Sequence, residues 1–414
     1  MATPIPTGIT LETVTYNGPS KDKKNLLFLG DGFGASDRAL FDKTIDEIVN
    51  RFFRKAPFNL RGVRQEFNFF KAFTPATSGI TCDVNIDING VTVPDNSGAG
   101  ASVGKMLIKN SALGLMYGVT IGGTPMARLI GPKTGDENLI MDFIATLSLP
   151  VESAADSLIP QCWAEPPSGV SSTLGKDHGM VIVLVNDDKY GGGGGSDFAM
   201  VCLGDGNGFP GLTSSVAGRD HSPITLRNNY NNLYSVAIHE LAHSYFKLKD
   251  EYCEVHNPAI ATTANHFSRN PNAITRADVL TAGNFDPSKI KWNKVAFTGS
   301  TDKLITTTAF NYMNTNKKPL WERPAGTNCA TLPFDGATKY PPRTVRGTIR
   351  YPQRIIGAYE GGGRQFCGTY SPAGSCRMRS TNIDSDFCFV CKHAIIENIK
   401  PELLEELYRR FYPR

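Results

Sequence analysis

A pair of histidines four residues apart is the feature that most restricts how this 414-residue chain can fold. His239 and His243 flank Glu240 within residues 230–252, where apolar residues recur with helical spacing. Positions i and i+4 of a helix lie on one face, one turn apart, so both imidazoles point the same way. The pattern therefore predicts a helix that presents both histidines beside a glutamate. The sequence holds only seven histidines, which makes a chance arrangement of this kind uncommon.

Two imidazoles on one helical face can bind a single Zn²⁺ ion, and the adjacent Glu240 can take a proton from water. A catalytic zinc also needs a third protein ligand. Asp250 and Glu251 are both candidates, and the sequence does not separate them. A straight helix would carry Asp250 about 10 Å past His243, so we expect the helix to end between Ser244 and Lys249. The alternative is that both acids are ordinary solvated side chains.

Short apolar runs and amphipathic segments alternate along the chain. Buried strands are predicted at 25–30, 65–70 and 180–185, and helices over about 38–54, 136–147 and 392–412. Residues 77–135 are rich in Gly, Ser and Asn and predict loops with short strands. The alternation indicates an α/β fold.

Two glycine-containing segments follow predicted strands. Residues 31–37 form a turn without the Gly-Lys-Ser/Thr of a phosphate-binding loop, which disfavours a nucleotide site. Five glycines at 191–195 are read as a tight loop leading to an edge strand over 198–203, in preference to a flexible linker between domains.

Charge and hydropathy exclude two classes of partner. With 43 Lys+Arg and 39 Asp+Glu, the formal charge of +4 is too small to attract nucleic acid in bulk. The apolar runs fall short of the roughly 20 residues that a membrane-spanning helix needs. Residues 1–23 lack the basic and apolar regions of a secretory signal. The sequence thus predicts no membrane span and leaves open a mature exported chain, another export route, or a cytoplasmic protein.

Nine cysteines leave at least one unpaired if the others form disulfides within the chain. Four of them, over 367–391, favour a local disulfide staple. The rival interpretation is a structural zinc site, since Cys388-Phe-Val-Cys391 has the spacing of metal ligands, and free thiols are the third.

Four ordered blocks resemble one family. Residues 239–252 resemble the extended zinc motif of the immunoglobulin-A-peptidase family of metallopeptidases. Residues 27–33 resemble its opening strand and turn, 181–194 its central strand and glycine loop, and 360–391 its C-terminal block.

The resemblance implies a metzincin-like zinc peptidase domain: a mixed twisted sheet with an active-site helix, and a lower subdomain with a methionine turn. Met378 matches that methionine, and Met313 is the competitor. Tyr370 is implied as a hydrogen-bond donor to the transition-state oxyanion. Metzincins usually have glycine where this chain has Phe246, which is disfavoured if the turn needs a positive φ. Ala242 stands where the family often has glycine.

The expected organisation is an extended segment over 1–23 and one catalytic unit over 24–414, with an insertion within 254–350. The expected function is a zinc endopeptidase with Zn²⁺ as cofactor and Glu240 as general base, acting on a protein or peptide substrate. No residue identifies immunoglobulin A as that substrate. Two alternatives are a metal-stabilised binding or adhesion protein, and an unrelated zinc peptidase with a distant glutamate ligand. Cysteine usage favours an extracellular or cell-surface location.

Overall fold

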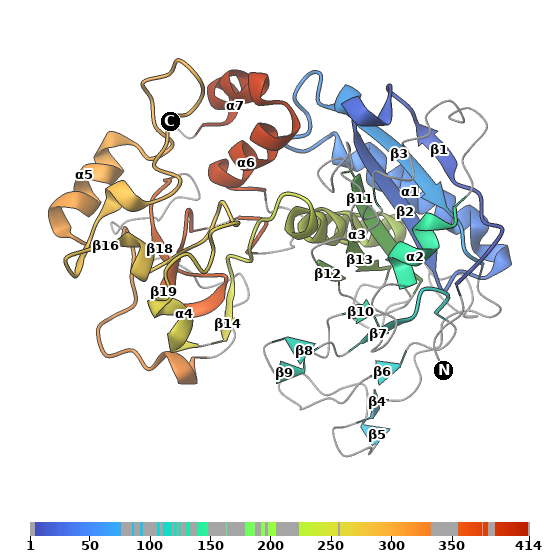
Figure 1. The fold of residues 1–414 in the computed structure, drawn as a ribbon, viewed down its shortest axis with the longest axis horizontal. Coiled ribbons are helices and arrows are strands. Elements are labelled where there is room, and N and C mark those ends of the chain that lie inside the picture. The colour runs from blue at the N-terminus through green and yellow to red at the C-terminus, as the bar shows by residue number, and fades with distance from the viewer. Residues whose placement is uncertain are drawn as a thin grey trace, which may run out of the picture. The chain divides into compact units, whose positions relative to one another are not determined.

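The structure is a computed structural model. It describes residues 5–75, 111–117, 139–147, 163, 179–186, 192–194, 198–203, 223–255, 257–332, 355–374, 376–379 and 386–412, and short strands between 85 and 132. The chain divides into two compact units (Figure 1), Met1–Phe53 with Arg64–Tyr245, and Arg54–Val63 with Phe246–Arg414. The single catalytic unit over 24–414, the segment over 1–23 and the insertion within 254–350 stay predictions.

A six-stranded mixed sheet organises the first unit. Its strands, in spatial order, are β1 (Glu12–Thr15), β3 (Phe67–Ala72), β2 (Lys24–Asp31), β11 (Gly179–Val185), β13 (Ala199–Cys202) and β12 (Gly192–Gly194). The four central strands are parallel to one another, and the two outer ones pair antiparallel. The predicted strands at 25–30, 65–70 and 180–185 are confirmed, and so is a mixed α/β fold.

Successive side chains of the central strands point to opposite faces of the sheet. On one face, Leu27 and Val183 join a buried cluster with Phe143 of α2 (Leu139–Ala145). On the other face, Phe52 of α1 (Arg38–Phe52) packs edge-on against Phe69, with ring centroids 6.3 Å apart. Helix α3 (Pro223–Ser244) lies beside α1 (Figure 1). Because both faces are covered, apolar residues predominate in the central strands, which explains the apolar runs in the sequence.

The glycine segment does not form the loop that its composition predicts. Gly192–Gly194 are themselves the edge strand, antiparallel to Ala199–Val201, and the apolar strand β13 lies one place inside. Glycine retains the main-chain N–H and C=O that a ladder needs, so a run of glycines can still pair. Residues 191 and 195 lie outside the described part of the chain.

Short strands follow β3, as predicted for 77–135. Two pairs are β4 (Asn85–Ile86) with β5 (Thr92–Val93), and β8 (Thr120–Ile121) with β9 (Thr124–Pro125). In a three-stranded sheet, β7 (Leu115–Tyr117) lies between β10 (Ile130–Pro132) and β6 (Met106–Leu107).

Asp31, the last residue of β2, is completely buried. Its carboxylate accepts hydrogen bonds from Ser111 Oγ at 2.6 Å and from the N–H groups of Ala112 and Leu113 at 2.7 and 3.3 Å. Burial raises its pKa to about 6, against the lowering effect of these hydrogen bonds. The side chain thereby fixes the 111–113 segment to the end of the central strand.

A smaller sheet organises the second unit. Strand β19 (Arg364–Ser371) pairs with β14 (Cys253–Val255), β15 (Ile274–Thr275) and β18 (Tyr359–Gly362), and β16 (Leu280–Thr281) pairs with β17 (Asn284–Phe285). The helices are α4 (Pro258–Thr262), α5 (Thr307–Asn316), α6 (Phe389–Ile399) and α7 (Leu404–Phe411). Trp292 is fully buried, and its indole N–H donates to the carbonyl of Gly357 at 2.7 Å. Of the helices in the described residues, none is long and apolar enough to cross a bilayer.

The predicted single helix over 392–412 is wrong. Helix α6 ends at Ile399, a 3₁₀ turn over Pro401–Leu403 follows, and α7 begins at Leu404. Pro401 has no N–H to continue the ladder and disfavours helical geometry at Lys400, which is extended here with φ −158°.

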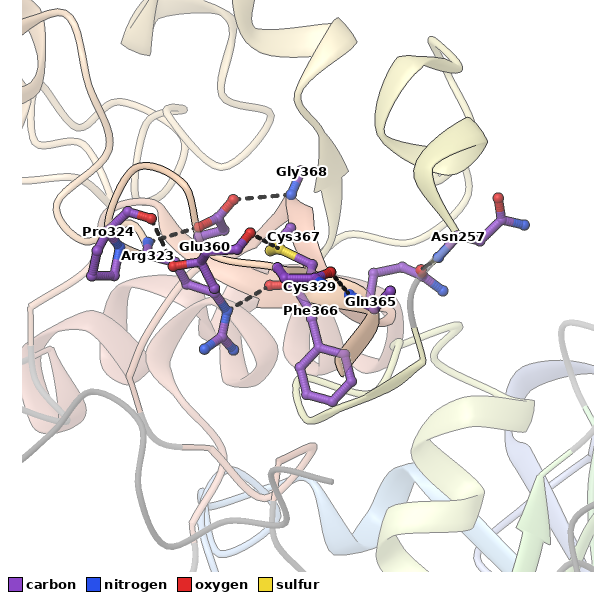
Figure 2. The surroundings of a disulfide bond; sticks show 12 residues. Asn257, Arg323, Pro324, Cys329, Glu360, Gln365, Phe366, Cys367 and Gly368 are labelled. Atoms are coloured by element: carbon purple, nitrogen blue, oxygen red, sulfur yellow. Dashed lines mark hydrogen bonds between the residues drawn. A yellow bond between two sulfur atoms is a disulfide. The ribbon is translucent and has the colours of Figure 1, made fainter. Parts of the chain in front are cut away.

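One disulfide joins Cys329 to Cys367 across 38 positions of sequence (Figure 2). Beside it, the Glu360 carboxylate accepts hydrogen bonds from the main-chain N–H groups of Arg323 at 2.8 Å and Gly368 at 3.0 Å. The predicted local staple within 367–391 is wrong, because its other three cysteines are free and buried. Cys82 and Cys162 lie outside the described residues.

Candidate metal centre and catalytic site

Helix α3 presents the two histidines of the motif side by side. The Nε2 atoms of His239 and His243 lie 3.1 Å apart, and their rings are nearly perpendicular, at 88°. The helix ends at Ser244, within the predicted window, and the Ser244 hydroxyl donates to the carbonyls of Glu240 and of Phe198, at 3.1 and 3.0 Å. The second of these bonds attaches the last turn of α3 to the chain just before β13.

The helix holds its functional residues against a buried face. Ala237, before the motif, and Leu241, within it, are at most 1% exposed, so the helix packs through residues that alternate with the functional ones. His239 is 4% exposed and Glu240 9%, which leaves the glutamate carboxyl largely shielded from bulk water.

The two histidines fit a bound zinc ion. Zinc–nitrogen bonds of about 2.0–2.1 Å in a tetrahedron separate two ligand nitrogens by roughly 3.3 Å. The observed separation of 3.1 Å between the Nε2 atoms is close to that value. Imidazole nitrogens with a carboxylate form a donor set that suits zinc among the common metals of proteins.

The backbone conformation of Lys247 explains how Phe246 can occupy the position where metzincins usually have glycine. The positive φ falls at Lys247, where it is 55°, and Phe246 is not among the residues with a positive φ. Phe246 is instead 5% exposed and packs with Phe58 at 6.2 Å between ring centroids. The left-handed residue therefore has an exposed, unbranched side chain, and the bulky one keeps ordinary geometry.

Asp250 lies in the second unit and is 8% exposed. Its main-chain carbonyl accepts a 2.6 Å hydrogen bond from the N–H of Gly363. Gly363 has φ +59°, and a Cβ at this position would come within 2.3 Å of the Phe267 ring. Only glycine meets both demands here, so the triple glycine of the C-terminal block fixes the backbone that carries Asp250.

Glu251, the adjacent acid, is fully buried, and its carboxylate contacts Asn272 and Cys391. Its Oε1 accepts from Asn272 Nδ2 at 3.0 Å and lies 3.3 Å from Cys391 Sγ. Its main-chain N–H donates to the carbonyl of Met378 at 2.7 Å. Burial, followed by the charge of Cys376, raises the pKa of its carboxyl well above the usual range. Asn272 carries no sequence signal that would have identified it.

Met378 lies in a tight turn, closed by the N–H of Arg379 donating to the carbonyl of Cys376 at 2.9 Å. Met378 is completely buried. Met313, the competitor, is buried within helix α5 and is therefore not a turn residue.

Tyr370 belongs to β19 and is 2% exposed. Its ring packs edge-on against Phe285, with centroids 5.6 Å apart. Burial, followed by the charge of Glu360, raises the pKa of the phenol, which therefore stays protonated as a hydrogen-bond donor needs. Its predicted oxyanion role stays a prediction.

The other two described histidines, His266 and His393, contact neighbouring residues of the second unit. His393 Nε2 lies 2.9 Å from the carbonyl of Ala296, and burial lowers its pKa to about 4. The His266 ring contacts Phe267. His178, His221 and His256 lie outside the described residues.

Comparison with known families identifies one match. The model of the family described as IgA Peptidase M64 matches residues 171–399, which is more than half of the chain and includes both histidines, both acids and Met378. No curated protein matches the sequence.

Proposed function

Because the chain belongs to the IgA peptidase M64 family, we propose that it is a zinc-dependent endopeptidase that hydrolyses peptide bonds of protein or peptide substrates. The observation that carries this proposal is the 3.1 Å approach of the His239 and His243 Nε2 atoms beside Glu240. Family membership supports a peptidase, and the paired imidazoles support the metal-dependent type.

Three residues would hold the zinc ion: His239, His243 and Asp250. Asp250 is chosen over Glu251 because the Glu251 carboxylate is fully buried against Asn272 and Cys391. When bound, zinc supplies a Lewis acid for the scissile carbonyl and lowers the pKa of a coordinated water.

Glu240 is proposed as the general base. Its carboxylate takes a proton from the attacking water and returns that proton to the nitrogen of the leaving amine. One residue can perform both steps because the proton that it gains in the first is the one that it donates in the second. Met378 is proposed to support the site from its buried turn, and Tyr370 to donate a hydrogen bond to the oxyanion.

Glu240→Gln tests the mechanism directly. The substitution keeps the size of the side chain and removes its basicity, so zinc content is expected to stay at the wild-type level. Cleavage of casein or of a quenched fluorescent peptide is expected to fall about 10²- to 10⁴-fold. Glu402→Gln, at an exposed position before α7, is the matched control. A Glu240→Gln protein that retains zinc and cleaves as fast as wild type would refute the proposal.

Asp250→Asn tests the third ligand. An amide is a weaker zinc ligand than a carboxylate, so this variant is expected to lose activity and one equivalent of zinc while its circular dichroism is unchanged. Full zinc content together with wild-type cleavage would reject Asp250 as a ligand.

An extracellular or cell-surface location is proposed as well. The disulfide between Cys329 and Cys367 supports it, because such bonds persist in oxidising compartments. Fractionation of the producing cells, with the protein found in the reducing interior, would contradict this location.

A further inference from the structure

Three cysteines and one glutamate form a buried cluster within the second unit. Cys376, Cys388, Cys391 and Glu251 each offer one ligand atom, and these atoms all lie within 4.8 Å of one another. None of the four residues is more than 3% exposed, and the three cysteines are free thiols. The peptidase mechanism uses none of these side chains.

The spacing in the cluster suits a tetrahedral metal ion. Cys376 Sγ lies 3.7 Å from Cys391 Sγ. A disulfide needs about 2.05 Å, whereas zinc–sulfur bonds of about 2.3 Å place two ligand sulfurs roughly 3.8 Å apart. Glu251 Oε1 lies 3.3 Å from Cys391 Sγ and 3.8 Å from Cys388 Sγ, so the carboxylate occupies a further corner of the same tetrahedron.

The buried carboxylate of Glu251 is incompletely satisfied by the protein. Its Oε1 contacts Asn272 and the thiols, but its buried Oε2 has no hydrogen-bond partner among the described residues. A carboxylate in such surroundings is costly unless a cation neutralises it.

The local fold favours thiolates at this place. Cys388 caps helix α6 and Cys391 lies in its first turn, where the positive end of the helix dipole stabilises negative charge. Two buried arginines, Arg377 and Arg379, follow Cys376 along the chain on either side of Met378, and Arg379 Nη1 donates to the carbonyl of Glu251 at 3.1 Å. The two positive charges of these arginines offset the net negative charge of a Zn²⁺ ion bound by three thiolates and one carboxylate.

We propose that Glu251, Cys376, Cys388 and Cys391 bind a structural Zn²⁺ ion, separate from the ion proposed at the histidines. Four protein ligands complete the tetrahedral shell, which is typical of structural sites, and catalytic sites keep one position for water. The ion links the chain immediately after Asp250 to the Met378 turn and to the start of α6. It therefore stabilises the backbone around the proposed catalytic ligand without taking part in the reaction.

The experiment removes the histidine site and asks whether zinc remains. The double variant His239→Ala/His243→Ala, purified as the full chain, is expected to retain about one zinc per chain by elemental analysis. Addition of Cys388→Ala is expected to abolish that zinc. Cys253→Ala, which removes a buried cysteine side chain of the same unit outside the cluster, is the matched control and is expected to keep the zinc.

Cobalt gives a second readout that does not depend on catalysis. The double histidine variant reconstituted with Co²⁺ is expected to show a thiolate-to-cobalt charge-transfer band in the near ultraviolet, which Cys388→Ala removes. If Cys388→Ala does not fold, the spectrum of the double histidine variant decides. Absence of both zinc and this band would overturn the proposal, as would alkylation of the unfolded, unreduced wild type that shows a disulfide between any two of the three cysteines.

Discussion

The Cys329–Cys367 disulfide allows a quantitative prediction about the second unit. The bond closes a loop with a sequence separation of 38. Replacement of both cysteines by serine removes this constraint from the unfolded chain. The loop-closure relation gives about 13 cal/mol/K for a loop of this length, or about 4 kcal/mol at 25 °C. A unit of this size then loses roughly 8–16 °C of melting temperature.

The native contacts around the bond are expected to survive the substitution. Glu360 still accepts hydrogen bonds from the N–H groups of Arg323 and Gly368, so the loss acts mainly through the unfolded state. Urea unfolding followed by tryptophan fluorescence is a suitable assay, because Trp292 is fully buried in the same unit.

A reductant supplies the internal check. Treatment of the wild type with a non-thiol reductant is expected to reproduce the stability of the Cys329→Ser/Cys367→Ser protein, and the variant itself is expected not to respond. Cys253→Ala controls for the loss of a buried cysteine side chain in this unit. Equal stability of variant and wild type, with and without reductant, would refute the reasoning.

Three further predictions follow from buried groups. Asp31 has a folded pKa of about 6 against 3.8 for the free residue, so its contribution to stability is complete below pH 3.8 and is lost, by about 3 kcal/mol, as the pH rises through 6. Asp31→Asn should flatten the unfolding free energy over that window, and an unchanged slope would contradict the assignment. Gly363→Ala should lower the free energy of unfolding by at least about 1–3 kcal/mol, because the added methyl group clashes with Phe267. Gly283→Ala, at a residue with φ +82° and open space around it, measures the cost of the backbone conformation alone in the same melting experiments. Equal losses of stability in the two variants would exclude the clash. Trp292→Phe should cost about 1–3 kcal/mol in urea unfolding, because it leaves a buried carbonyl without its donor, and no loss would show that the hydrogen bond is dispensable.

The main strands were predictable because their environment is uniform. Residues 25–30 and 180–185 are covered on both faces, so nearly every position is apolar and the run is visible in the sequence. The break at Pro401 was missed because the apolar stripe continues across it, and the stripe depends on burial whereas the break depends on one missing N–H. The glycine edge strand was missed because its stability lies in main-chain pairing, which leaves no trace in side-chain type.

The site was predictable only where the geometry is local. The helical spacing of His239 and His243 places them together without reference to the rest of the chain. The surroundings of Glu251, on which the proposed choice of Asp250 as ligand depends, were not predictable, because they include cysteines far away in the sequence. Cysteine pairing was missed for the same reason, since connectivity is a property of the folded chain.

The contacts of Glu251 also determine when in synthesis this region can assemble. Its bonds to Arg379, Cys388 and Cys391 span 128, 137 and 140 positions of sequence. These partners are synthesised long after Asp250 and Glu251. Contacts between residues so far apart in sequence form late in folding, because the long loop between them must first be closed at a cost in entropy. A nascent or truncated chain that ends before Cys376 carries the complete His239–His243 motif but lacks this support. The contacts that support Glu251 can therefore form only after residues 376–391 have been synthesised, and a chain cut short before them is expected to be a poor peptidase.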